Sequence, residues 1–68
     1  MSAWNAEEQT MVDLIELSGY GVLTTAHMDY HIAQLFEPNY LKPLTFRAAT
    51  EYEAIRKAFN TWSKRNEN

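Results

Sequence analysis

The chain has 68 residues, 46% of them hydrophobic, with no cysteine and a formal net charge of −3. This composition is typical of a folded domain rather than a disordered segment, and the lack of cysteine excludes disulfides and thiolate metal sites. The length predicts a single domain over residues 1–68, near the lower size limit for a self-sufficient hydrophobic core, so a homodimer or a bound partner is a reasonable expectation.

The first predicted element is a helix over residues 6–18. Asn5 and Glu8 have the spacing of a capping box, in which the asparagine side chain accepts a hydrogen bond from a free N–H at the helix start. The hydrophobic residues that follow have helical spacing. Gly19 or Gly21 then ends the helix, because glycine readily adopts the left-handed conformation that closes helices.

Residues 22–36 fit two structures. Val22–Ala26 and Tyr30–Phe36 are rich in β-branched and aromatic side chains, and they could form a hairpin that turns near residues 27–29. The apolar residues of the same segment also match helical spacing and end before a proline. We favour two strands, because the β-branched and aromatic side chains suit a pleated surface.

Residues 38–43 are predicted to be a loop, since a proline stands at each end. Leu44–Ala48 alternates in hydrophobicity as a third strand, and Thr50 and Glu53 form a second capping box before an amphipathic final helix. The predicted fold class is therefore α+β with the order α-β-β-β-α. We expect a small antiparallel sheet with both helices packed on one face.

His27, Asp29 and His31 form the only cluster with the side chains of a metal site. On a strand the three side chains would share one face, and on a helix the two histidines would lie one turn apart. Apart from Glu37, no fourth ligand is near in sequence, and a polar strand face or turn explains the cluster better. We therefore predict no metal site and no cofactor.

The sequence contains no pattern typical of an enzyme. The serines lack the glycine-flanked turn that exposes a nucleophile. The acidic pairs Glu7/Glu8 and Glu51/Glu53 lie at predicted helix starts, where capping accounts for them. A core of this size also leaves little room for a substrate pocket. We therefore predict that the protein is not an enzyme.

The predicted order of elements is also that of the double-stranded-RNA-binding fold. Those domains begin their last helix with lysines that hold phosphates. Here the corresponding segment is Glu51-Tyr52-Glu53, which would repel phosphates, and the net charge is negative. Direct binding of nucleic acid is therefore disfavoured.

Charge is divided by position in the chain. The first 37 residues contain six acidic residues and neither lysine nor arginine, whereas all six basic residues follow. An acidic face of this kind selects basic protein partners. A tyrosine in the proline-bounded loop would add an aromatic anchor of the type that interfaces favour. The predicted partner-binding residues are Glu7, Glu8, Asp13, Glu16 and Tyr40.

In its size, its acidity, the acidic helix Glu7–Glu16 and its lack of a catalytic motif, the chain resembles the small phage-encoded inhibitors of bacterial defence, of which anti-CRISPR proteins are the best known. The resemblance implies a stoichiometric inhibitor that binds a nucleoprotein complex in the cytoplasm of a bacterial host. It would occupy a nucleic-acid-binding surface or block assembly of a nuclease complex. The alternative is a small homodimeric regulatory or structural module.

The chain gives no indication of membrane contact. No apolar run approaches the roughly 20 residues that span a bilayer. The start of the chain has neither the basic region nor the apolar region of a secretory signal. We therefore expect a soluble, cytoplasmic protein.

Overall fold

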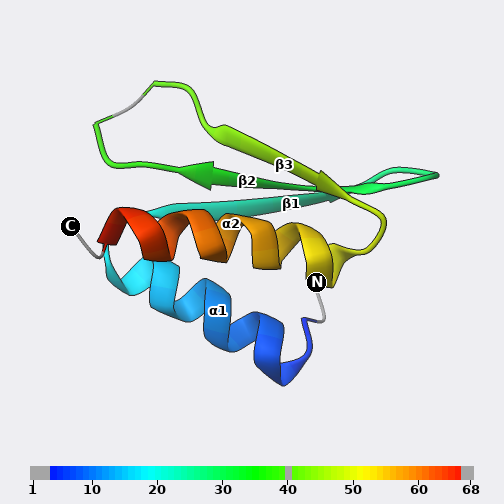
Figure 1. Ribbon diagram of the computed structural model, residues 1–68, viewed down its shortest axis with the longest axis horizontal. Helices are drawn as coiled ribbons and strands as arrows, with labels where there is room; N and C mark the ends of the chain where they lie inside the picture. The colour runs from blue at the N-terminus through cyan, green and yellow to red at the C-terminus, as the bar shows by residue number, and fades with distance from the viewer. Residues whose placement is uncertain (1–3, 40, 67–68) are drawn as a thin grey trace.

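The computed structural model describes residues 4–39 and 41–66 and contains two helices and three strands in these residues. The strands form an antiparallel sheet in the order β1-β2-β3, and both helices cover the same face of it (Figure 1). The predicted α+β fold with the order α-β-β-β-α is confirmed. The elements are α1 (Ala6–Leu17), β1 (Gly21–Ala26), β2 (His31–Phe36), β3 (Leu44–Ala48) and α2 (Glu51–Asn66).

Helix α1 starts at the predicted capping box. The Asn5 side chain accepts a hydrogen bond from the backbone N–H of Glu8 at 2.8 Å, and the Glu8 carboxylate accepts one from the backbone N–H of Asn5 at 2.9 Å. Two donors without a helical partner are thereby satisfied. The helix ends at Leu17, one residue before the predicted end, and Gly19 reverses the chain with φ of 95°, a conformation that favours glycine.

The interpretation of residues 22–36 as two strands is confirmed. β1 and β2 pair from Gly21↔Phe36 to Ala26↔His31. In β2, Ala33 and Leu35 are fully buried, while the residues between and beside them are more exposed. This alternation follows from the two-residue period of a strand, and it buries one face of the sheet against the helices.

Helix α2 begins where the second capping pattern predicts. The hydroxyl oxygen of Thr50 accepts a hydrogen bond from the backbone N–H of Glu53 at 3.1 Å. The Glu53 carboxylate, however, accepts a hydrogen bond from the Thr50 hydroxyl and not from its backbone N–H. The cap of α2 therefore has the hydrogen bond from the Glu53 backbone N–H to the Thr50 side chain, but the Glu53 carboxylate bonds to the Thr50 hydroxyl in place of the backbone N–H.

The core lies between the sheet and the two helices. α1 packs against α2 and β1, whereas α2 lies mainly against β2 and β3. The helices run side by side in the same direction (Figure 1). No helix or strand among residues 4–39 and 41–66 covers the other face of the sheet. The buried hydrophobic residues are Met11, Val12, Ile15, Ala33, Leu35, Ala54, Ile55 and Ala58.

Substitution of Leu35 tests this placement of the core. Leu35→Ala removes a fully buried side chain, and we expect the free energy of unfolding to fall by about 2–5 kcal/mol because the site cannot collapse completely. Leu41→Ala is the matched control, since Leu41 is fully exposed in the loop between β2 and β3 and its truncation should leave stability unchanged. Urea denaturation compares the two variants, and equal losses would contradict the assignment.

Candidate protein-binding surface

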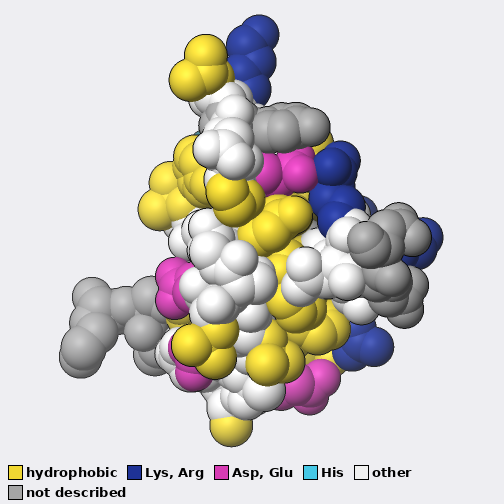
Figure 2. Space-filling model, turned by 90° about the vertical axis from the view of Figure 1, so that its left-hand side faces the viewer, with side chains coloured by type: hydrophobic (Ala, Val, Ile, Leu, Met, Phe, Trp, Pro, Cys, Tyr) yellow, Lys and Arg dark blue, Asp and Glu magenta, His cyan; other side chains and the backbone are white. Residues whose placement is uncertain are grey.

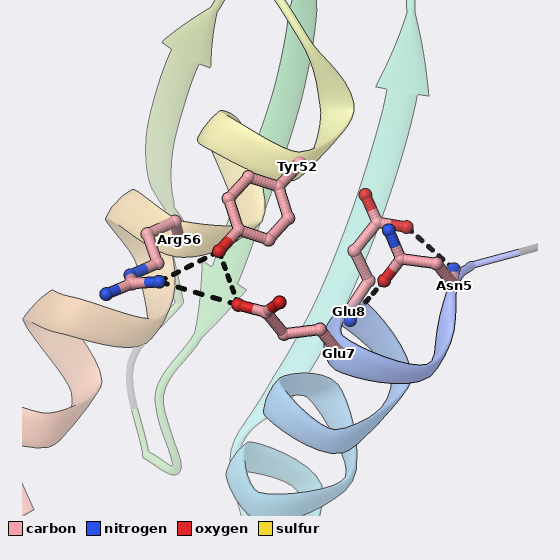
Figure 3. Close-up of polar contacts among 5 residues, drawn as sticks. All are labelled: Asn5, Glu7, Glu8, Tyr52 and Arg56. Atoms are coloured by element: carbon pink, nitrogen blue, oxygen red, sulfur yellow. Dashed lines mark hydrogen bonds and ion pairs between the residues drawn. The ribbon is translucent and has the colours of Figure 1, made fainter.

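Glu7 faces α2 and is held by it. Its carboxylate accepts a hydrogen bond from the Tyr52 hydroxyl, and its Oε2 atom lies 3.6 Å from Nη1 of Arg56 (Figure 3). The same Nη1 atom donates a hydrogen bond to the Tyr52 hydroxyl oxygen at 2.8 Å. The carboxylate remains solvent-exposed, but its charge is already balanced within the protein.

Glu8 points to the sheet side of α1 and is only 6% exposed (Figure 3). Its carboxylate accepts the hydrogen bond from the backbone N–H of Asn5 at 2.9 Å. Glu8 was predicted to belong to the acidic face that binds a partner, but its side chain is buried and does not lie on that face. The physical reason is the cap itself, which requires an acceptor close to the helix axis at this position.

Asp13 and Glu16 lie on the side of α1 that faces away from α2. Glu16 follows Glu7 by nine positions, which is about two and a half helical turns and therefore the opposite side. Both residues are exposed, and neither forms an ion pair within residues 4–39 and 41–66. Asp13 only accepts a hydrogen bond from the Gln9 side chain, at 2.8 Å.

Leu17 adds an apolar component to this side of α1. It is 84% exposed, and the described residues that line the open depression here are Asp13, Glu16 and Leu17. Figure 2 shows the end of the molecule at which both helices end, where hydrophobic side chains are exposed between acidic and basic ones. We call Asp13, Glu16 and Leu17 the acidic flank. The sequence pattern did not identify Leu17, although its offset of two positions from the buried Ile15 places it off the apolar stripe.

The basic residues do not form a comparable free surface. Nη1 of Arg65 donates to the Glu37 carboxylate at 2.8 Å. Nζ of Lys57 donates to the backbone oxygen of Arg47 at 2.8 Å, and the Arg47 guanidinium lies 3.8 Å from the centre of the Tyr30 ring. Most of the positive charge is therefore engaged within the protein. The basic residues held in this way are Arg47, Arg56, Lys57 and Arg65.

The start of α2 is acidic, as the sequence indicates. Glu51 and Glu53 lie in its first turn, and the Glu51 carboxylate accepts a hydrogen bond from Nε1 of Trp4 at 3.1 Å. Phosphates would meet negative charge at this helix end rather than the lysines of an RNA-binding domain. The acidic start of α2 therefore supports the prediction that the protein does not bind nucleic acid directly, which remains a prediction.

The histidine cluster is divided between a turn and a strand. His27 and Asp29 lie in the connection between β1 and β2, and His31 begins β2, so the arrangement on one strand face is not present. The His27 ring stacks on the Tyr30 ring, with 4.6 Å between centroids. Among the described residues, no group of three His, Cys, Asp or Glu side chains could hold a metal ion.

Tyr40, the remaining predicted partner-binding residue, lies outside the described residues. Within the described part of the chain, neither helix has the length and hydrophobicity required to cross a bilayer.

Comparison with protein-family models, with characterised proteins and with solved structures finds no match to this chain.

The ion pair between Arg65 and Glu37 gives a second testable prediction. Glu37 is 8% exposed, and its other carboxylate oxygen has no hydrogen-bond partner. Arg65→Met leaves this carboxylate without its cation, and we expect the free energy of unfolding to fall by about 1–3 kcal/mol. Lys64→Met, one position away on the exposed side of α2, should change it by less than about 0.5 kcal/mol. Urea denaturation measures both, and similar effects would contradict a structural role for the pair.

Proposed function

We propose that this protein is a non-catalytic binding module that docks the acidic flank of α1 onto a cationic surface of another protein. The observation that carries the proposal is the pair of exposed carboxylates, Asp13 and Glu16, which have no ion pair in the described structure. The exposed Leu17 beside them can be desolvated by a partner. A hydrophobic contact next to charges that guide association is typical of protein interfaces.

The chemistry of the acidic flank supports binding rather than catalysis. The described residues of the depression supply two carboxylates and a leucine from successive turns of one helix. They provide no side-chain nucleophile of the Ser, Cys or Lys type and no second element to orient a substrate. Charged groups in such an open position act on the rate and selectivity of association.

The resemblance to small phage-encoded inhibitors of bacterial defence names the partner to test first. A CRISPR-type nucleoprotein complex holds its nucleic acid on surfaces rich in lysine and arginine. An acidic flank that occupies such a surface would act stoichiometrically, by competing with the nucleic acid for the same cations. In this role the protein would work in the cytoplasm of a bacterial host.

Charge reversal on the acidic flank tests the proposal. We expect Asp13→Lys/Glu16→Lys to abolish co-elution with a purified CRISPR effector complex and to abolish inhibition of its nuclease activity, because attraction becomes repulsion. The variant should fold, since both side chains are exposed. Asp29→Lys, compared with the single variant Glu16→Lys, is the control: the two change the net charge equally, but Asp29 is an exposed position elsewhere on the molecule, and Asp29→Lys should retain binding.

Two results would contradict this function. In the first, the Asp13→Lys/Glu16→Lys variant still inhibits as the unchanged protein does. In the second, the unchanged protein runs as a stable dimer on a sizing column and co-elutes with none of the effector complexes. The second result would favour the homodimeric module instead.

A further inference from the structure

Two leucines of α1 are exposed to solvent. Leu14 is 44% exposed and Leu17 is 84% exposed. Side chains three positions apart are neighbours on the surface of a helix, so the two leucines form one apolar strip. This strip is not part of the core, since the buried residues of α1 are Glu8, Met11, Val12 and Ile15.

Free carboxylates border the apolar strip on one side only. Asp13 neighbours Leu17 at a separation of four positions and Glu16 at a separation of three. On the other side, Leu14 follows Glu7 by seven positions, about two turns, and therefore lies toward α2. The order around the helix, starting from α2, is thus Leu14, Leu17 and then the two carboxylates.

Glu16 occupies an unfavourable position for the stability of α1. It lies in the last turn of the helix, which contains no basic residue, and the C-terminal end of a helix carries a partial negative charge. Glu16 also forms no ion pair within residues 4–39 and 41–66. A cation from outside the chain would relieve this repulsion, so the charge pattern here is complementary to a basic partner.

We propose that the partner contacts α1 through an amphipathic helix, whose apolar residues pack on Leu14 and Leu17 and whose basic residues meet the two carboxylates. This inference rests on the proposed function and specifies the form of the partner. An exposed helix presents ridges of side chains three and four positions apart, and a second helix packs its own ridges into the grooves between them. Recognition of a helix through apolar residues at this spacing is common among protein complexes.

The arrangement of α1 defines the chemistry of the partner helix. Its apolar residues should recur at three- and four-residue steps, so that they form one stripe. Lysine or arginine is favoured on the flank of that stripe that reaches Asp13 and Glu16. The opposite flank lies toward Glu7, whose carboxylate is already paired with Arg56, and no charge is selected there.

A second copy of α1 is a poorer occupant of the same strip. The first 37 residues contain neither lysine nor arginine, so another α1 offers no cation to Asp13 and Glu16. It would instead bring further negative charge into the interface, and like charges in juxtaposition disfavour association.

The probe is a synthetic peptide of about 18 residues, or five helical turns, with leucines on one helical stripe and lysines on one flank of it. The control peptide has the same composition, but its leucines and lysines alternate, so that a helix mixes them on every side. Fluorescence anisotropy measures the affinity, and circular dichroism measures the helix content. We expect the first peptide to bind with a gain of helix, and the control to bind about tenfold more weakly.

Substitution of the leucines tests the apolar strip. Glutamine is the replacement because its helix propensity is close to that of leucine. We expect Leu17→Gln to weaken binding of the first peptide by about tenfold and Leu14→Gln by about threefold, in the order of the exposed area that a partner can bury. Leu41→Gln is the matched control, since Leu41 is fully exposed in the loop between β2 and β3, and should leave binding unchanged.

Glu16→Gln should change stability and binding in opposite directions. Removal of a negative charge from the last turn of α1 should raise the Tm by about 2–5 °C. Loss of the contact with a basic residue should weaken peptide binding by about two- to fivefold. Asp29→Asn removes the same charge outside any helix and should change neither quantity. Unchanged affinity of Glu16→Gln would contradict the contact with the partner.

The outcomes separate helix docking from the proposed function. If the two peptides bind equally and Leu14→Gln has no effect, helix docking is wrong, and docking through the acidic flank stands. If neither peptide binds, this inference is overturned, and the charge-reversal variant decides the proposed function separately. If the protein alone is dimeric and Leu17→Gln makes it monomeric, a second copy is the occupant and the inference is also overturned.

Discussion

The rotation of α1 about its own axis is the constraint on which the proposed surface depends. At its start, Glu7 contacts Tyr52 and Arg56 of α2. Beyond its end, the Ser18 hydroxyl oxygen accepts a hydrogen bond from Nε1 of Trp62 at 2.7 Å. Glu7 and Ser18 are eleven positions apart, about three turns, so both contacts lie on the same side of the helix. The opposite side is thereby directed to solvent.

Packing supplies the stability of this arrangement, and the polar contacts select among orientations. Burial of a side chain such as Val12 or Ile15, both with no exposed surface, contributes roughly 1.5–3 kcal/mol. The ion pair between Glu7 and Arg56 is exposed on both partners, and pairs of this kind contribute about 0–1 kcal/mol. The apolar stripe therefore holds α1 on the sheet and α2. Within the small range of rotations that this packing allows, the contacts of Glu7 and Ser18 favour the observed one.

Local signals in the sequence were sufficient for the fold. Caps and strands depend on residues close in the chain, and this is why the start of α1 and the limits of β3 agree with the prediction. Whether an acidic side chain is paired or free depends partly on residues that are distant in the sequence. Arg56 pairs with Glu7, which is 49 positions away in the chain. The hydrophobic pattern of each helix does not predict how the two helices are placed relative to each other. Glu8 is different, because in a capping box the acidic side chain at this position accepts a hydrogen bond from the backbone N–H of the N-cap residue, so its engagement follows from a local pattern.

An open strand edge is a hazard for any small sheet, because main-chain hydrogen bonds are available to every extended chain. On β3 the hazard is reduced directly, by a lysine bound to the backbone. On β1 no described residue outside β2 bonds to the strand backbone, and the strand itself carries no charged side chain. Such an edge stays accessible to main-chain pairing, which is indifferent to sequence.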